Sequence, residues 1–139
     1  MKRIICLLCA FGLAAASCTG NDTATTAPTT AAPLLSNEFT GTLTQNGAAS
    51  YPFTVLASGT VTGTIVSLAP DLSQLVGFGI GVWDGFSCQA SPGIWNDKAS
   101  QNTIVTGTVN AAGSLCVRIY DSQGTMPQPS TYDITVTHP

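Results

Sequence analysis

The residues that could carry out chemistry are few and widely spaced. The chain has one histidine, His138, one residue from its C-terminal end, where we expect the backbone to fray. A serine or cysteine nucleophile needs a base beside it, so no triad is predicted. A carboxylate pair for glycoside cleavage is formally possible, but Asp84 and Asp121 stand at predicted strand ends beside turn residues, where aspartate is common. We therefore predict that the protein is not an enzyme and needs no cofactor.

The N-terminal residues have the order of an export signal. Met1-Lys2-Arg3 precede an apolar run, Ile4 to Ala16, that is shorter than the roughly 20 residues a membrane span requires. The segment Leu13 to Cys18 resembles the lipobox of bacterial lipoproteins, in which the cysteine is lipidated and becomes the first residue. This resemblance implies a signal peptide over residues 1–17 and lipidation at Cys18. It also implies a cell-envelope location in the outer membrane; the alternative is ordinary cleavage that releases a secreted or periplasmic protein.

This prediction gives each of the five cysteines a place. Cys6 and Cys9 leave with the signal, Cys18 carries the lipid, and Cys88 and Cys116 remain in the body. Since exported proteins fold in oxidising compartments, we predict a structural disulfide between the two body cysteines. The alternative of a redox-active pair lacks the C-x-x-C spacing.

Residues 18–36 are predicted to form a tether. They are rich in Thr, Ala and Pro and show no apolar periodicity, a composition that gives a semi-extended linker. Without the signal, Lys98 and Arg118 face seven Asp and Glu residues, a net charge of −5. An acidic chain of this kind does not attract a phosphate backbone, so nucleic acid is not an expected partner.

Residues 37–139 alternate apolar and polar positions between turn signals. This pattern predicts an all-β fold, an antiparallel, jelly-roll-like β-sandwich of about seven to eight strands. The glycines at 77, 79 and 81 alternate within one predicted strand and are expected to leave one face nearly bare. Residues 84–101 are expected to form a long loop. The strand segments begin near Phe39, Tyr51, Val61, Val76, Ile104, Leu115 and Tyr132.

The order of five short motifs resembles the bacterial pre-peptidase C-terminal domain. These motifs are Gly41-Thr42-Leu43, Tyr51-Pro52-Phe53-Thr54-Val55, Val82-Trp83-Asp84-Gly85, the run from Ala112 to Tyr120, and Tyr132-Asp133-Ile134-Thr135-Val136. The resemblance implies a jelly-roll sandwich that acts as an attachment or secretion module. Some members bind calcium through acidic residues, for which Asp71, Asp84 and Asp121 are the candidates here. Asp71 is the one acid in the segment leading to the central strand, and calcium prefers several carboxylates, so we predict no metal.

Three aromatic residues are the candidate ligand-binding residues. Trp83, Trp95 and Tyr120 could offer a flat face to a sugar ring or a partner protein, since binding residues often lie on loops of a rigid scaffold. The alternative is that the tryptophans cap the open end of the core. Two functions follow: a non-catalytic, lipid-anchored interaction or structural module of the cell envelope, or a small carbohydrate- or peptide-binding module. The expected partners are the membrane, through the lipid, and an envelope protein or polysaccharide.

Overall fold

The computed structural model describes residues 32–139, apart from the side chain of Pro92. The predicted signal peptide, the lipidation site Cys18 and most of the tether lie outside these residues. The described chain forms eight strands: β1 (Leu35–Leu43), β2 (Ala48–Val55), β3 (Gly59–Ala69), β4 (Val76–Trp83), β5 (Cys88–Ala99), β6 (Ile104–Val109), β7 (Gly113–Tyr120) and β8 (Ser130–His138).

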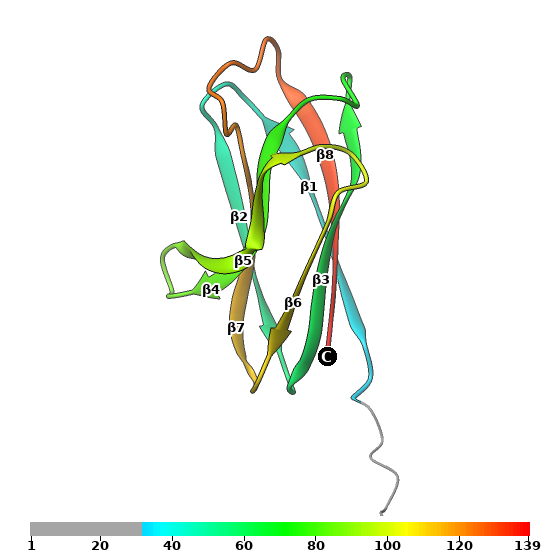
Figure 1. The fold of residues 1–139 in the computed structure, drawn as a ribbon, viewed down its shortest axis with the longest axis vertical. Helices are drawn as coiled ribbons and strands as arrows, with labels where there is room; N and C mark the ends of the chain where they lie inside the picture. The colour runs from blue at the N-terminus through cyan, green and yellow to red at the C-terminus, as the bar shows by residue number, and fades with distance from the viewer. Residues whose placement is uncertain (1–31) are drawn as a thin grey trace, which may run out of the picture. The chain divides into compact units, whose positions relative to one another are not determined.

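The strands make two antiparallel sheets packed face to face, as Figure 1 shows. One sheet has the order β1-β8-β3-β6 and the other β2-β7-β4-β5. Consecutive strands therefore alternate between the sheets, except for β4 and β5, which pair as neighbours. This is the strand order of an eight-stranded jelly roll, and the predicted fold class is confirmed.

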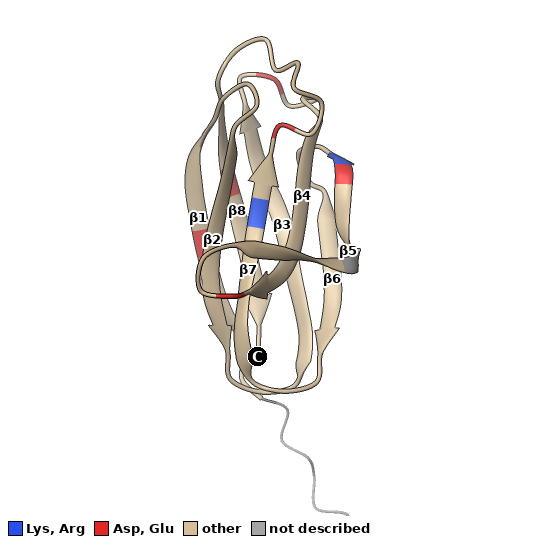
Figure 2. Cartoon of the chain, turned by 90° about the vertical axis from the view of Figure 1, so that its left-hand side faces the viewer, with Lys and Arg blue, Asp and Glu red and all other residues tan. Residues whose placement is uncertain are grey.

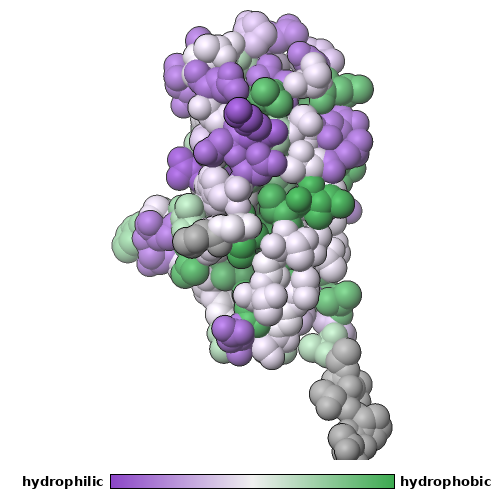
Figure 3. Space-filling model, in the orientation of Figure 1, coloured by the Kyte–Doolittle hydropathy of each residue, from purple (hydrophilic) through white to green (hydrophobic). Residues whose placement is uncertain are grey.

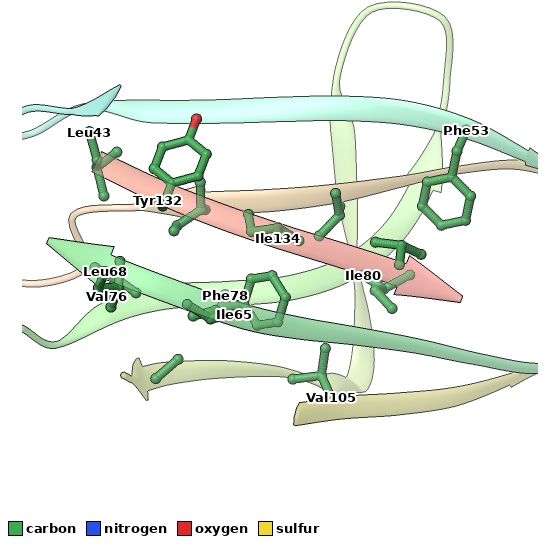
Figure 4. Packing of buried hydrophobic residues seen from close by; sticks show 14 of the residues in the cluster. Leu43, Phe53, Ile65, Leu68, Val76, Phe78, Ile80, Val105, Tyr132 and Ile134 are labelled. Carbon is green, nitrogen blue, oxygen red and sulfur yellow. The ribbon is translucent and has the colours of Figure 1, made fainter. Parts of the chain in front are cut away.

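The core lies between the two sheets and follows the alternation seen in the sequence. In β8, for example, every second residue from Ser130 to His138 is buried, because successive side chains of a strand point to opposite faces. Burying one Val, Leu, Ile or Phe side chain contributes about 1.5–3 kcal/mol. Figure 4 shows side chains from both sheets meeting in this layer, among them Leu43, Phe53, Ile65, Phe78, Ile80, Val105 and Ile134.

The two ends of the described chain are paired with each other. β1 begins at Leu35, two residues before the predicted start of the sandwich, and Leu35 pairs with His138. The His138 ring is buried, with Nε2 2.7 Å from Asn37 Oδ1, and it packs at 5.1 Å from the Phe53 ring centre. The expectation of a frayed C-terminus is therefore wrong, because the last strand is held inside a sheet.

The expected loop over residues 84–101 is largely a strand. β5 occupies Cys88–Ala99 and pairs with β4. Its pairing is interrupted: Gly81 pairs with Ala90 but Gly79 with Trp95, so residues 91–94 leave the ladder as a bulge. Such a bulge breaks the period-two pattern, which explains why the sequence of this segment does not indicate a strand.

Candidate functional site

The outer face of the sheet β2-β7-β4-β5 carries two of the three candidate aromatic residues. Gly77 pairs with Tyr120, and Gly79 pairs with Arg118 on one side and Trp95 on the other. Residues directly opposite each other in an antiparallel pair point to the same face. The register therefore gathers Tyr120, Arg118 and Trp95 over the glycines of β4, and we call these three side chains the platform.

The two aromatic rings fill the space that the glycines leave. A Cβ atom added at Gly79 would come closer than 3.0 Å to carbons of the Trp95 ring, and one added at Gly77 closer than 3.0 Å to carbons of the Tyr120 ring. Glycine is needed at both positions because only a residue without a side chain lets another group approach the backbone this closely. The expectation of a nearly bare face is wrong, because the two rings cover the glycine strand.

A chain of hydrogen bonds fixes the two rings. Trp95 Nε1 donates to the Tyr120 hydroxyl at 2.9 Å, and this hydroxyl donates to Asp97 Oδ1. Ser122 Oγ donates to the backbone oxygen of Asp97 at 2.6 Å, which holds the acceptor in place. Burial, followed by the hydrogen bond to Asp97, raises the pKa of Tyr120 above its usual value. Tyr120 therefore remains a donor at neutral pH, and the rings are locked 6.0 Å apart.

Arg118 is the cationic member of the platform. Its guanidinium carbon lies 5.4 Å from the centre of the Tyr120 ring, within the range of a cation–π contact. Its Nε is buried and has no hydrogen-bond partner among residues 32–139. In this part of the chain Lys98 is the other basic residue besides His138, and Figure 2 shows how sparse charged residues are on the strands.

The turn between β4 and β5 forms a hairpin beside the platform. Beyond Gly79 the hairpin turns across the sheet: a Cβ added at Gly81 would collide with the backbone oxygen of Gln89. The predicted disulfide is present between Cys88 and Cys116, with the Cα atoms 5.6 Å apart. It fastens the start of β5 to β7, although β4 lies between these strands in the sheet. Figure 1 shows the hairpin projecting from the sandwich, and Figure 3 shows the same projection in a space-filling view.

Asp84 organises the tip of this hairpin. Its carboxylate accepts hydrogen bonds from the backbone nitrogens of Phe86 and Ser87 at 2.8 and 2.7 Å, and from the side chains of Ser87 and Gln89. These bonds, above all those from the Ser87 and Phe86 backbone, hold the pKa of Asp84 well below its usual range. The turn presents the Phe86 side chain, which is 94% exposed.

Trp83 does not belong to the platform. It lies at the end of β4 opposite Cys88, within the hairpin, whereas Trp95 and Tyr120 contact each other. The sequence singled out the three aromatic residues but not Arg118, Gly77 or Gly79 as platform positions. The sequence does hold one signal for this grouping. Arg118 and Tyr120 are two residues apart in one strand, and so are the two glycines, and residues two apart in a strand point to the same face.

The three calcium candidates do not form a group. Asp71 caps its own loop by accepting hydrogen bonds from Ser73, and Asp84 caps the hairpin. Asp121 accepts from four backbone nitrogens, which lower its pKa although burial, the largest single contribution, raises it. Within residues 32–139 there is no cluster of three or more His, Cys, Asp or Glu side chains that could hold a metal ion.

Neither a protein-family description nor a curated protein sequence matches the chain. In the described part, no helix has the length and apolar character needed to cross a bilayer. The features that bear on function are therefore the N-terminal sequence and the platform, which offers aromatic rings, a cation and hydrogen-bonding groups for recognition.

Proposed function

We propose that the protein is a non-catalytic, lipid-anchored component of the cell envelope whose β-sandwich serves as an interaction module. The lipobox-like residues ending at Cys18 support the anchor, and the composition of residues 19–34 supports a tether between the anchor and β1. Each buried methylene of an acyl chain contributes about 0.8 kcal/mol, so more than one chain gives a stable attachment. The resemblance of five motifs to pre-peptidase C-terminal domains supports a role in attachment, and the lipobox-like segment supports the outer membrane as the location.

Replacing the anchor cysteine tests this proposal. In cells that produce Cys18→Ala, the protein should move from the membrane fraction to the soluble fraction, while the wild type stays with the membrane. Intact-mass analysis should find a mature wild-type chain that begins at Cys18 and carries acyl mass. A soluble mature wild type without acyl mass would favour the secreted or periplasmic alternative.

A carbohydrate-binding function is the second candidate, and one observation favours it. Trp95 and Tyr120 lie over Gly79 and Gly77 and are joined by a hydrogen bond, so two partly exposed rings are held in place before any ligand arrives. The negative face of an aromatic ring attracts weakly positive C–H groups, such as those of a sugar ring. A fixed pair of rings loses little side-chain entropy on binding, which favours affinity.

The two tryptophans provide a matched test of this candidate. Binding of a panel of polysaccharides is measured by calorimetry on the wild type, Trp95→Ala and Trp83→Ala, and tryptophan emission of the wild type reports whether Trp95 changes its surroundings. We expect Trp95→Ala to lower the affinity at least about tenfold, as removal of a central aromatic contact does. Trp83→Ala should bind as the wild type does, because Trp83 lies in the hairpin. Equal losses in both variants, or none in either, would exclude the platform as the binding surface.

A further inference from the structure

Arg118 occupies the middle of the platform and has no charged partner there. Across the sheet it stands between Ser50 of β2 and Gly79 of β4, and Trp95 follows on the far side of Gly79. The guanidinium donates no hydrogen bond within residues 32–139, and its Nε is buried without an acceptor. Within the described residues, one of the few cations of the chain is therefore unpaired on this face.

An unpaired guanidinium of this kind favours an anionic ligand. The Nε is enclosed by the protein and is out of reach of a ligand, but the two terminal nitrogens are not among the buried atoms and have no partner within residues 32–139. A carboxylate can pair with these two nitrogens, because its two oxygens match the planar fork of an arginine in a bidentate, charge-assisted pair. Since Arg118 lies against the Tyr120 ring, a carboxylate bound to Arg118 would be carried by a group that lies on the aromatic rings.

Asp97, beside the Tyr120 hydroxyl, places a further requirement on the ligand. Its Oδ1 accepts from the Tyr120 hydroxyl and its side chain is exposed, so its second oxygen is available to accept from a ligand hydroxyl. The Asp97 carboxylate would repel a second carboxylate on the same ligand ring. The complementary ligand therefore has one carboxylate and several hydroxyl groups on a ring with a C–H face, which is the chemistry of a uronic acid.

We propose that the platform binds an acidic polysaccharide, with a uronate ring stacked on Trp95 beside Tyr120 and its carboxylate paired with Arg118. This inference rests on the carbohydrate-binding function proposed above and names its ligand class. An acidic peptide shares the carboxylate but lacks the ring and the hydroxyl donors, so the aromatic surface and Asp97 favour the sugar.

The test uses two forms of one polymer. The full chain is titrated by calorimetry with polygalacturonate and with its methyl-esterified form, which has the same backbone without the charges. We expect the wild type to bind the acidic form about tenfold or more tightly than the ester. Arg118→Gln should abolish this preference, and Arg118→Lys should retain part of it. Lys98→Gln removes an equal charge outside the platform and should keep the affinity within about twofold.

The other outcomes distinguish a failure of the acidic-polysaccharide inference from a failure of the carbohydrate-binding function. Equal binding of both polymers by the wild type overturns the carboxylate inference but leaves the carbohydrate-binding platform in place. Binding of polyglutamate as tight as that of polygalacturonate overturns the sugar assignment. If no polymer binds and Trp95→Ala behaves as the wild type across the polysaccharide panel, both the inference and the carbohydrate-binding function are wrong. Thermal melting of each variant shows that a lost affinity does not come from unfolding.

Discussion

The outer faces of the two sheets differ in composition although they belong to one sandwich. On the sheet β1-β8-β3-β6, the register pairs threonine with threonine: Thr62 stands beside Thr106 and Thr137, and Thr64 beside Thr135. On the sheet β2-β7-β4-β5, the corresponding central positions hold Gly77 and Gly79, flanked by Tyr120 and Trp95. We call the first the threonine face and keep the name platform for the rings and cation of the second.

On the threonine face the residue types follow strand propensity, whereas on the platform side they follow the packing of the two rings. Threonine is β-branched and fits a pleated, half-exposed surface, so the threonine face satisfies strand propensity without further partners. Glycine in the interior of a strand weakens it, and its presence at two alternate positions of β4 needs another cause. The cause here is the pair of rings seated on the glycines. A departure from strand propensity therefore marks the candidate site, whereas the regular face marks the scaffold.

Removal of the disulfide should have the largest effect on this contrast. The double substitution Cys88→Ala and Cys116→Ala should lower the free energy of unfolding by about 2–5 kcal/mol. It should also release the hairpin from β7, on the platform side, while the threonine face keeps its structure. Denaturant unfolding measures the loss, and amide exchange locates it. Increased exchange spread evenly over both sheets would show that the bond stabilises the whole sandwich and not the platform side in particular.

Filling the glycine space should have the next largest effect. Gly79→Ala and Gly77→Ala each place a methyl group against an aromatic ring, and overpacking of this kind costs about 1–3 kcal/mol. The Trp95 emission should change with the stability, because the ring must move. Gly113→Ala is the matched control: nothing lies within 4 Å of its added Cβ. If all three variants melt together, the rings do not depend on the glycines.

Acidification should loosen the hairpin before it affects the rest of the molecule. The pKa of Asp84 is lowered in the folded state, so its contribution to stability is complete above the unfolded value of about 3.9 and is lost as the pH falls toward the lowered pKa. Amide exchange at Phe86 and Ser87, followed from neutral pH downward, should rise relative to that of the threonine face. In Asp84→Asn this extra pH dependence should be absent; its persistence would assign the effect to another group.

Substitutions on the threonine face should have the smallest effect. Thr62→Ala and Thr106→Ala remove exposed or half-exposed side chains that pair with each other, and surface changes of this type usually stay within about 0.5 kcal/mol. Binding of any ligand at the platform should not change. Calorimetry and thermal melting measure both quantities. A loss of binding here would contradict the assignment of this face to the scaffold.

The sequence predicted most of the fold because strand alternation is a local signal. The apolar positions of β2, β4, β7 and β8 alternate clearly, and they supply most of the core. β5 could not be recognised, because its place in the sheet depends on a bulge around Gly93, whose φ of 83° suits glycine. The position of a bulge is determined by the pairing with the neighbouring strand, and the residues of the bulged segment alone do not predict it.

The candidate site was predictable in its residue types but not in its grouping. Trp95 and Tyr120 were identified as a possible aromatic face, and they contact each other. The same prediction includes Trp83, which lies elsewhere. The turn of the hairpin after Gly79 separates it from the rings, and this turn depends on a backbone contact between Gly81 and Gln89. Contacts of that kind have no signature in a single sequence.

The position of β8 has a consequence for how the chain comes to fold. Among the strands of residues 32–139, β8 comes last along the chain, yet it lies between β1 and β3 in its sheet. That sheet cannot form until β8 has left the ribosome, and β1 must pair with a strand that is separated from it by the six others. Topologies dominated by such distant pairings fold slowly. The two-sheet core therefore stays open until β8 is available, so the sandwich assembles only after all eight strands have been made.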